Sequence, residues 1–445
     1  MHEESFNETS DEALETEKTA SKSVPVPFFL RQLNHGLEHN NLEEIVDALD
    51  QLIQKVPTHL KNDNDKEGFY HSLVHTFLRF LRHHKVISDT PKGSGETDTL
   101  VQTDNHQYLF EFKINTLKKE ASQIETTLGA LKQIFTRDYY KPVQQSGIPT
   151  TLIGVSFHPP SLKKRVNDAF QTVTCCALDL KKPNRSLYAY SHNNPTESIG
   201  RHNQYENFCT TKNWDQFHVT GESKETYEDK TSLAQTIEAY SDNLKHIQSA
   251  LLGNDLPIVF QTIDYILQDI PWSLRLFNAS YFQAVIYTAL LCTGLEVTPD
   301  KNCIIVQTDT QCFHFICSFT NSSNLKNIQK SMQQELLAKS SELNIENDIP
   351  ISLIVFNINQ APPMKDHDPK NKITLISQGL TIKNEIVYSL SGKKISRLSG
   401  LSAKKLDKKI NDLLLTSPRT PIEPKPTLAE KKDPQSPYKP PRNKK

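Results

Sequence analysis

Residues 96–113 read ETDTLVQTDNHQYLFEFK, and this stretch decides the fold of the chain. Two strand-like runs flank Asp104 and Asn105, residue types that tolerate a positive φ. The pattern predicts a β-hairpin with a two-residue turn, in which Leu100 faces Leu109 across the strands. Because helical segments precede and follow the hairpin, the chain is predicted to have an α/β or α+β fold.

The same register places two carboxylates opposite one another. Asp98 faces Glu111, with Cβ atoms about 4.5–5.5 Å apart, and Lys113 points to the same face of its strand as Glu111. Phe110 and Phe112 point the other way. Because the surrounding residues are apolar, the two like charges are costly to bury unless a cation compensates them.

Two interpretations of this pair remain open from the spacing. A hard divalent cation with oxygen ligands would compensate both carboxylates, and Mg²⁺ needs only one or two protein carboxylates together with water. Lys113 could then orient or stabilise a metal-bound hydroxide that attacks phosphorus. Alternatively, the segment is a surface strand with an ordinary Glu–Lys pair, which contributes little to stability.

Four motifs of the first half recur in the same order in the second half. They are an amphipathic helix that ends before a proline, an aromatic-rich helix, a VQTD turn and a strand of the form P-x-x-L-I. The two sets lie at 42–56, 68–81, 101–104 and 149–153, and at 256–270, 279–292, 306–309 and 350–354. Four matches in one order predict an internal duplication.

The composition limits the class of protein. The 445 residues carry 51 Lys and Arg against 52 Asp and Glu, which excludes a histone-like polycation. No apolar run approaches the roughly 18 residues needed to span a bilayer, and the N-terminus does not resemble a secretory signal. Seven dispersed cysteines without a CxxC pattern are typical of a reducing compartment, so we expect a cytoplasmic protein without a membrane segment.

Composition also divides the chain. The acidic N-terminus and the Pro- and Lys-rich C-terminus are predicted to be disordered, and a polar stretch in the middle is typical of a connection. The expected parts are a disordered N-terminus (1–27), a first domain (28–160), a connecting segment (161–235), a second domain (236–382), a basic helical segment (383–416) and a disordered tail (417–445).

The hairpin and its flanks resemble the PD-(D/E)XK nuclease superfamily. Asp98, twelve further residues and then Glu111-Phe112-Lys113 are similar to its D…(D/E)xK core. The context is closer to a bacterial branch that is often attached to an AAA-ATPase-like domain. Five ordered segments match its motifs: EGFYH (67–71), GETD (95–98), EFK (111–113), ALKQI (130–134) and LIGVSF (152–157).

The resemblance covers roughly residues 30–160 and implies a fold and a set of roles. The fold would be a restriction-endonuclease-like domain, in which helices flank a central mixed sheet. Asp98, Glu111 and the backbone carbonyl of Phe112 would hold Mg²⁺ or Mn²⁺. Lys113 would position the nucleophilic water.

Two further residues enter through the resemblance. Glu67 would add a metal ligand or a general-base contact, and Gln133 would approach the site from the following helix. From the residues alone, Glu67 is instead a first-turn helix acid favoured by the helix dipole, and Gln133 is a solvated helix residue. His71 and His75 have a spacing that can bind zinc, but no third ligand is evident, and packed or exposed histidines are favoured.

The chain departs from the family pattern in two places. Thr97 stands where the name-giving motif has proline, a variation that leaves the chemistry intact. The chain has no GxxxxGK[ST] loop, so ATP coupling is not expected.

The second copy lacks the charged residues of the first. In an ungapped match on VQTD, Cys303, Ile316 and Ser318 take the positions of the aspartate, glutamate and lysine. Pairing the preceding helices puts Ala279 at the position of Glu67. This half is therefore predicted to be a pseudonuclease that serves as a scaffold or binds substrate or a protein partner.

The sequence thus predicts a metal-dependent nuclease that hydrolyses phosphodiester bonds of DNA, with RNA the less favoured substrate. The alternative is a non-enzymatic interaction or effector protein built from nuclease-like folds. The intact set of charged residues in the first copy favours the enzyme. The neutral net charge is mildly against tight nucleic-acid binding, because phosphate contacts need clustered Lys and Arg.

Overall fold

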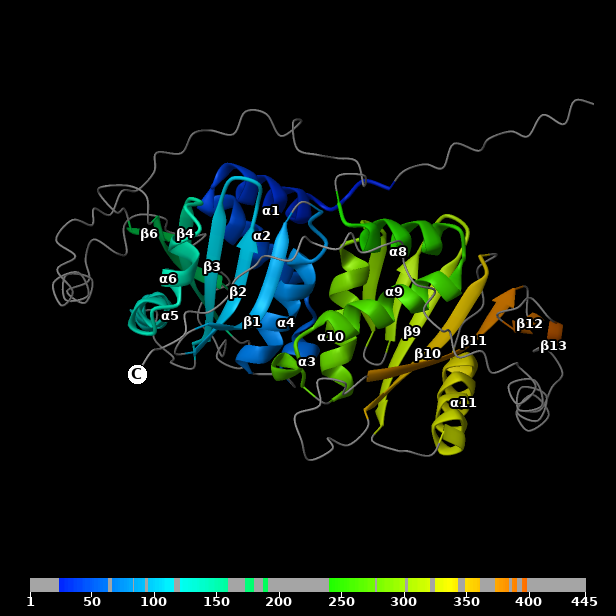
Figure 1. Cartoon of the computed structure of the whole chain (residues 1–445). Helices are drawn as coiled ribbons and strands as arrows, with labels where there is room; N and C mark the ends of the chain where they lie inside the picture. Colours follow the sequence, from blue (N-terminus) through cyan, green and yellow to red (C-terminus); the bar gives the residue numbers. More distant parts are fainter. Residues whose placement is uncertain are drawn as a thin grey trace, which may run out of the picture.

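A computed structural model describes residues 24–62, 66–82, 84–92, 95–115, 121–158, 173–179, 187–190, 240–276, 278–300, 303–320, 325–342, 349–360, 373–383, 386–389 and 394–397. These residues form two mixed β-sheets with helices on their faces (Figure 1). The fold is therefore mixed α/β, as the sequence predicts. In the described ranges, no helix is both long enough and apolar enough to cross a membrane.

The first unit contains the elements up to residue 190. Its helices are α1 (Phe28–His39), α2 (Leu42–Lys55), α3 (Thr58–Asn62), α4 (Glu67–Leu78), α5 (Ala121–Thr136) and α6 (Tyr140–Gln144). Its strands lie side by side in the order β1 (Lys85–Lys92), β2 (Gly95–Gln102), β3 (Gln107–Ile114), β4 (Thr150–Phe157), β5 (Val173–Asp179) and β6 (Leu187–Tyr190). The pair β3–β4 is parallel, and the other neighbours are antiparallel.

The β2–β3 hairpin has the predicted register, since Leu100 pairs with Leu109. The turn itself differs from the prediction, because neither of its two central residues takes a positive φ. Thr103 closes the turn instead. Its Oγ1 accepts a hydrogen bond from the backbone N–H of His106 at 3.0 Å, and its own N–H donates to the carbonyl of His106 at 2.9 Å.

Strand β3 presents alternate residues to two helical layers. Phe112 lies on the side of α4, where its ring centroid is 4.8 Å from that of His71. Leu109 lies on the opposite side, in a buried cluster that includes Leu131 of α5. By the same alternation, Glu111 lies on the α5 side of the sheet.

The second unit repeats this arrangement. Its helices are α8 (Asp242–Leu252), α9 (Leu256–Asp269), the 3₁₀ helix η3 (Trp272–Leu274), α10 (Ala279–Leu291) and α11 (Leu325–Glu342). Its strands lie in the order β7 (Glu296–Asp300), β8 (Cys303–Gln307), β9 (Cys312–Thr320), β10 (Ile351–Gln360), β11 (Ile373–Lys383), β12 (Ile386–Ser389) and β13 (Lys394–Arg397). Here β9–β10 is the parallel pair, and the other neighbours are antiparallel.

The helical pairs at the start of the two units are joined in the same way. Asn40 follows α1 with φ 54°, and Asn254 follows α8 with φ 55°. Asparagine is one of the few residue types that adopts this left-handed conformation readily. The next residue caps the following helix in both units, because Asn41 accepts from the N–H of Glu44 and Asp255 accepts from the N–H of Ile258.

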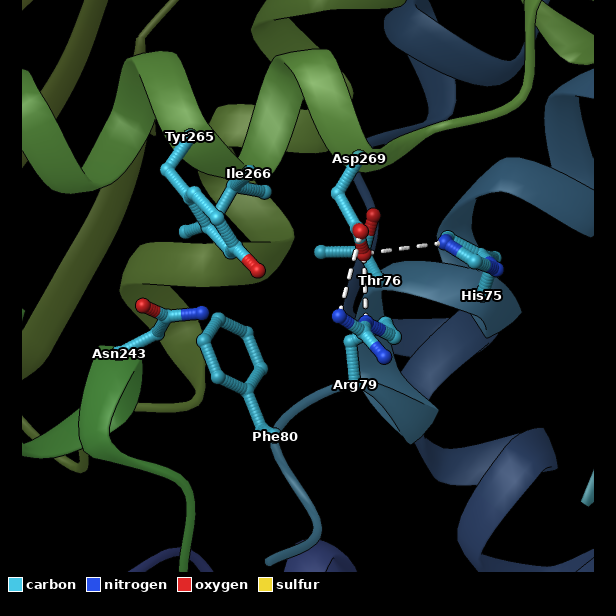
Figure 2. Close-up of a pocket in the computed structure, with 8 residues that line it drawn as sticks. All are labelled: His75, Thr76, Arg79, Phe80, Asn243, Tyr265, Ile266 and Asp269. Atoms are coloured by element: carbon cyan, nitrogen blue, oxygen red, sulfur yellow. Dashed lines mark hydrogen bonds and ion pairs between the residues drawn. The ribbon is translucent and has the colours of Figure 1, made fainter. Parts of the chain in front are cut away.

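The two units contact each other through α4 and α10, which lie between the sheets (Figure 1). Arg79, which directly follows α4, forms an ion pair with Asp269 of α9 beside a small pocket between the units (Figure 2). Near the start of α4, the hydroxyl of Tyr281 donates to Ser72 Oγ at 2.8 Å. Ser72 Oγ also lies 3.2 Å from the carbonyl oxygen of Leu274.

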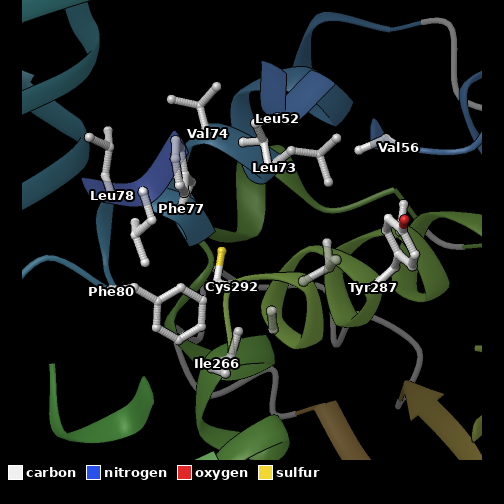
Figure 3. Close-up of a cluster of buried hydrophobic side chains, with 14 of the residues drawn as sticks. Leu52, Val56, Leu73, Val74, Phe77, Leu78, Phe80, Ile266, Tyr287 and Cys292 are labelled. Atoms are coloured by element: carbon white, nitrogen blue, oxygen red, sulfur yellow. The ribbon is translucent and has the colours of Figure 1, made fainter. Parts of the chain in front are cut away.

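One hydrophobic core runs through both units. Val74 and Phe77 of α4 belong to the same buried cluster as Tyr287 of α10 and Cys292 (Figure 3). A smaller cluster fills the space between the first sheet and α5. Because the larger core is continuous, burial of α10 contributes to the stability of the first unit as well as the second.

The prediction that residues 161–235 form a connecting segment is wrong where the structure describes them. Residues 173–179 and 187–190 form strands of the first sheet. Strand β5 is buried on both faces, with Cys175 in the larger core and Cys176 in the smaller one. A strand of this kind lacks the alternation of apolar and polar residues that marks a strand with one exposed face. The rest of the segment lies outside the described residues.

Two other predicted segments need correction. The basic helical segment, 383–416, begins with strands at 386–389 and 394–397, where β-branched and aromatic residues such as Ile386, Val387 and Tyr388 suit a sheet. The predicted disordered N-terminus, 1–27, extends too far, because residues 24–27 are described and Val26 is buried in the core. The remaining parts of both segments, and the predicted tail, lie outside the described residues.

Helix α5 approaches β4 closely at Gly154, which pairs with Glu111 of β3. A Cβ atom at Gly154 would lie 2.6 Å from the carbonyl oxygen of Thr127 and 2.7 Å from the backbone nitrogen of Leu131. Both neighbours are backbone atoms and can move only with the helix. Glycine therefore allows α5 to pack against the sheet next to Glu111.

We predict that Gly154→Ala lowers the free energy of unfolding by roughly 1–3 kcal/mol, because the added methyl group overpacks the α5–β4 contact. Gly129 on the same helix is the matched control, since a Cβ there meets nothing within 4 Å. Gly129→Ala should raise the stability by about 0.5–1 kcal/mol through helix propensity. Urea denaturation measures both values, and equal stability of the two variants would contradict the packing argument.

Candidate active site

Glu111 is the central residue of the candidate site. Its side chain is 0% exposed. Oε1 accepts hydrogen bonds from Lys113 Nζ at 3.2 Å and from Gln133 Nε2. Oε2 is buried and has no hydrogen-bond partner among the described residues. A buried carboxylate oxygen without a partner is costly, since its lost hydration is not replaced.

Asp98 lies at the neighbouring position on β2. Its Oδ2 accepts a hydrogen bond from the backbone N–H of Phe112 at 2.6 Å. The β2–β3 pairing reaches Thr99 and Phe110, so the same register continued by one residue puts Asp98 opposite Glu111. The hairpin thus brings the two predicted carboxylates together.

Lys113 connects Glu111 to the start of α4. Its Nζ lies 3.2 Å from Glu111 Oε1 and 3.3 Å from Glu67 Oε1. Burial by itself would lower the pKa of Lys113, but the charges of Glu111 and Glu67 outweigh it, so the pKa is raised. Lys113 therefore stays a cation at neutral pH and cannot act there as a general base.

Burial and the nearby charge of Asp98 raise the pKa of Glu111 to about 8, although the charge and hydrogen bond of Lys113 act in the opposite direction. At neutral pH, Glu111 is therefore mostly protonated as long as no additional cation is present. A cation that replaced this proton would compensate both carboxylates. The electrostatics of the pair thus favour a positive charge next to Glu111 Oε2.

The donor set fits a hard divalent cation in composition. Two carboxylates, Asp98 and Glu111, and the backbone carbonyl of Phe112 are oxygen donors of the kind that Mg²⁺ and Mn²⁺ prefer. Among the described residues, no group of three or more His, Cys, Asp and Glu side chains is arranged to hold a metal ion. Any cation here would therefore depend on these two carboxylates, on the Phe112 carbonyl and on water for its remaining ligands.

The structure brings all the predicted site residues to one end of the hairpin. Glu67 is the first residue of α4 and is also a first-turn acid, so both interpretations of this residue agree with its position. Gln133 on α5 contacts Glu111 directly and is not merely a solvated helix residue. Their positions were predicted through the family resemblance and not from residue spacing.

His71 and His75 pack against strand hydroxyls, as their packed interpretation predicts. His71 Nε2 lies 2.7 Å from Thr99 Oγ1, and His75 Nδ1 lies 2.7 Å from Ser88 Oγ. Burial lowers the pKa of His71 to about 3, so its imidazole is neutral. Thr99 was not singled out in the sequence, although a polar residue next to Asp98 in a buried strand was a signal for it.

Arg137 is a further residue that the sequence did not single out. It follows Gln133 by one helical turn, and its Nη1 donates to the hydroxyl of Tyr139 at 2.9 Å. This hydrogen bond and the charges of Glu111 and Asp98 all raise the pKa of Arg137. An exposed cation is therefore held on the α5 side within electrostatic reach of both carboxylates.

The corresponding position of the second unit holds no carboxylate pair. Cys303 pairs directly with Ile316 in the β8–β9 hairpin. Ser318 follows on the same strand, and its Oγ lies 2.9 Å from the Asn357 side-chain nitrogen. In place of glycine, β10 has Val355 as the partner of Ile316. These residues offer no oxygen donor set for Mg²⁺.

Residues 65–166 match the family model described as the PD-(D/E)XK nuclease superfamily. The matched range includes α4, the β2–β3 hairpin, α5 and β4, and therefore all the first-unit residues at the site. No curated protein matches the chain. The predicted resemblance to this superfamily is confirmed for residues 65–166, and it indicates a nuclease-like function for the first unit.

We predict that Glu111→Gln stabilises the metal-free protein at high pH. The folded-state pKa of about 8 exceeds the ordinary value, so the unfolded chain releases this proton first and the wild-type protein loses stability as the pH rises from about 4.5 to 8. Glutamine has no proton to release. The variant should exceed the wild type by on the order of 2 kcal/mol at pH 9.

The measurement is urea denaturation in EDTA at pH 4 and pH 9. The advantage of Glu111→Gln should be present at pH 9 and absent at pH 4. The exposed Glu296 provides a control for the loss of a surface carboxylate, and Glu111→Gln should gain more stability at pH 9 than Glu296→Gln does. A difference for Glu111→Gln that is equal at both pH values would contradict the raised pKa.

Proposed function

We propose that the first unit is a divalent-metal-dependent nuclease that hydrolyses phosphodiester bonds, with DNA preferred to RNA. One observation carries the proposal: the buried Glu111 keeps an unpartnered oxygen next to a second carboxylate, Asp98. Such a pair is costly for a structural role alone. The superfamily match of residues 65–166 supports the same chemistry.

Asp98, Glu111 and the carbonyl of Phe112 are the residues that would hold Mg²⁺ or Mn²⁺. When bound, the cation would act as a Lewis acid that polarises the phosphodiester and lowers the pKa of bound water. Gln133 fixes the orientation of Glu111 by donating to Oε1, which leaves Oε2 for the cation. The Phe112 N–H holds Asp98 in the same way through Oδ2.

Lys113 would serve the reacting groups. Because its ammonium group stays charged, it can orient a water molecule by donating a hydrogen bond and can stabilise negative charge on the phosphorane-like transition state. Glu67 accepts from the same ammonium group and is 42% exposed. It is therefore the carboxylate best placed to accept a proton from solvent-accessible water, or to add a ligand.

Exposed cations on α5, on α6 and between them would contact the nucleic-acid backbone. Lys132, Arg137 and Lys141 are all exposed, and Arg137 lies within electrostatic reach of the carboxylate pair. Phosphate contacts of this type give affinity that falls as salt increases. Hydrolysis needs no nucleotide, in agreement with the lack of a GxxxxGK[ST] loop in the sequence.

We infer that the second unit is a duplicated copy without catalytic activity. The same strand order, the same parallel pair and the same left-handed asparagine before the capped helix support a common origin. Cys303, Ile316 and Ser318 at the equivalent positions support the loss of chemistry. The free cysteines at described positions support a cytoplasmic location.

The direct test uses the full-length protein with plasmid DNA, single-stranded DNA and RNA, each with Mg²⁺, Mn²⁺ or EDTA. We expect cleavage with a divalent cation and none with EDTA, with DNA cut faster than RNA. Binding of the cation without cleavage of any substrate would favour the alternative, a non-enzymatic interaction protein.

We predict that Asp98→Ala lowers cleavage at least 100-fold and removes Mn²⁺ binding, because one of two carboxylate ligands is lost. Calorimetric titration of Mn²⁺ into the wild type and the variant measures the binding. Cys303→Ala changes the equivalent residue of the second unit and should leave both binding and cleavage unchanged. If metal-dependent cleavage persisted in Asp98→Ala, the site would be assigned wrongly or the second unit would be active.

We predict that Lys113→Met lowers kcat at least 100-fold and leaves Mn²⁺ binding largely intact, because Lys113 serves the nucleophile and not the cation. Methionine keeps most of the aliphatic volume and removes the charge. The exposed Lys132 provides the matched control, and Lys132→Met should change the salt dependence of KM more than kcat. Cleavage by Lys113→Met at the wild-type rate would show that the lysine is structural.

A further inference from the structure

A polar cluster at the contact between the units joins α9 to α4. Asp269 of the second unit lies with Oδ2 2.5 Å from Arg79 Nε and 3.5 Å from His75 Nε2. Burial would raise the pKa of Asp269, but the neighbouring His75 and Arg79 lower it overall. Figure 2 shows the carboxylate between these two side chains. Asp269 is therefore an anion that faces a nearly buried imidazole.

A continuous row of short contacts leads from this imidazole to the candidate active site. His75 Nδ1 lies 2.7 Å from Ser88 Oγ, which lies 2.9 Å from Thr99 Oγ1. Thr99 Oγ1 lies 2.7 Å from His71 Nε2. The ring of His71 packs on that of Phe112, with the two ring centroids 4.8 Å apart.

The number of protons available for these hydrogen bonds requires that all three point in the same direction along the row. Three hydrogen bonds need three protons, and the hydroxyls of Ser88 and Thr99 supply one each. The third comes from a ring nitrogen at one end, either His75 Nδ1 or His71 Nε2. When both imidazoles are neutral, each carries a single N–H, so the tautomer of one histidine then determines the tautomer of the other.

Asp269 selects one of the two directions. A carboxylate facing His75 Nε2 favours the proton on that nitrogen, which leaves Nδ1 as an acceptor for the Ser88 hydroxyl. Ser88 then accepts from Thr99, and Thr99 accepts from His71 Nε2. The opposite direction would place the bare Nε2 lone pair of His75 against the carboxylate.

The cluster has no counterpart on the other side of the contact. By the helix spacing that relates the two halves, Lys55 of α2 takes the position of Asp269. Tyr287 takes that of His75, and Leu291 takes that of Arg79. The acid and the two bases therefore occur only where the second unit meets the helix that flanks the carboxylate pair.

We infer that Asp269 is a positioning residue of the second unit, which orders the row His75–Ser88–Thr99–His71 and thereby the packing of His71 against Phe112. The catalytic part of this inference rests on the proposed nuclease function, whereas the ordering of the row does not. It gives the second unit a role in the first site that requires no ligand of its own.

The test uses ¹⁵N NMR of the histidine rings in the full-length, metal-free protein at pH 8. In the wild type, we expect His71 and His75 to carry their protons on Nε2. Asp269→Leu should shift the His75 Nε2 signal toward that of a bare nitrogen, and the His71 Nε2 signal should shift in the same direction. Tyr265 lines the same pocket and is 49% exposed, so Tyr265→Phe is the control that leaves both signals unchanged.

Ser88→Ala interrupts the row and keeps the inference testable if Asp269→Leu does not fold. In the Ser88→Ala variant, the tautomer of His71 should no longer depend on residue 269. The second substitution Asp269→Asn tests this dependence with a side chain of the same size. If His71 responded to residue 269 equally with and without Ser88, the row would not transmit the effect. Unchanged His71 signals in folded Asp269→Leu would overturn the inference.

Kinetics separate this inference from the proposed function. If the protein cuts DNA, Asp269→Leu and Ser88→Ala should each lower kcat about 5- to 20-fold with KM unchanged, and the double variant should be no slower than either single one. Additive losses would contradict a shared pathway. If the protein cuts nothing, the nuclease proposal fails, and the NMR result alone decides whether Asp269 orders the row.

Discussion

The burial of Glu111 beside Asp98 is the constraint on which the first unit depends. A carboxylate with no exposed surface needs donors. One of them, Lys113, lies on the same strand, and the other, Gln133, lies on α5. Gln133 can reach Glu111 only because α5 lies close to the sheet. That approach in turn requires glycine at position 154, opposite Glu111. The β2–β3 hairpin, helix α5 and Gly154 therefore all contribute to stabilising the buried carboxyl group of Glu111.

The second unit shows how the same topology is built without that cost. Where the first unit pairs Glu111 with Gly154, the second pairs Ile316 with Val355. Two apolar side chains replace a carboxyl group and a glycine, and no donor from the following helix is needed. Replacing buried charges by packed apolar residues is often neutral or stabilising. The fold thus does not depend on the charged residues, and their presence in the first unit points to a function and not to stability.

The sequence allowed the hairpin, its register and the recurrence of the helical pairs to be predicted, because each rests on local periodicity. Only some of the site residues could be predicted from the spacing of the sequence. Asp98, Glu111 and Lys113 follow from strand alternation, but Glu67 and Gln133 lie on separate helices, and no spacing rule connects them to the hairpin. Strand β5 was missed, since it is buried on both faces and shows no alternation. Thr99 and Asp269 were missed because their significance lies in contacts between distant segments.

The larger hydrophobic core is continuous across both units, so the stability of each unit depends on the other. Separate cores would have left the stability of each unit independent of the other. Instead α10 and α4 share one buried cluster, and Tyr281 donates to Ser72 next to the first turn of α4, which carries Glu67. The polar cluster around Asp269 lies further along the same contact. The second unit therefore supports α4 near both of its ends, and α4 supplies Glu67 and the two histidines that pack beneath the carboxylate pair. The candidate site of the first unit is therefore built on a helix that the second unit holds in place.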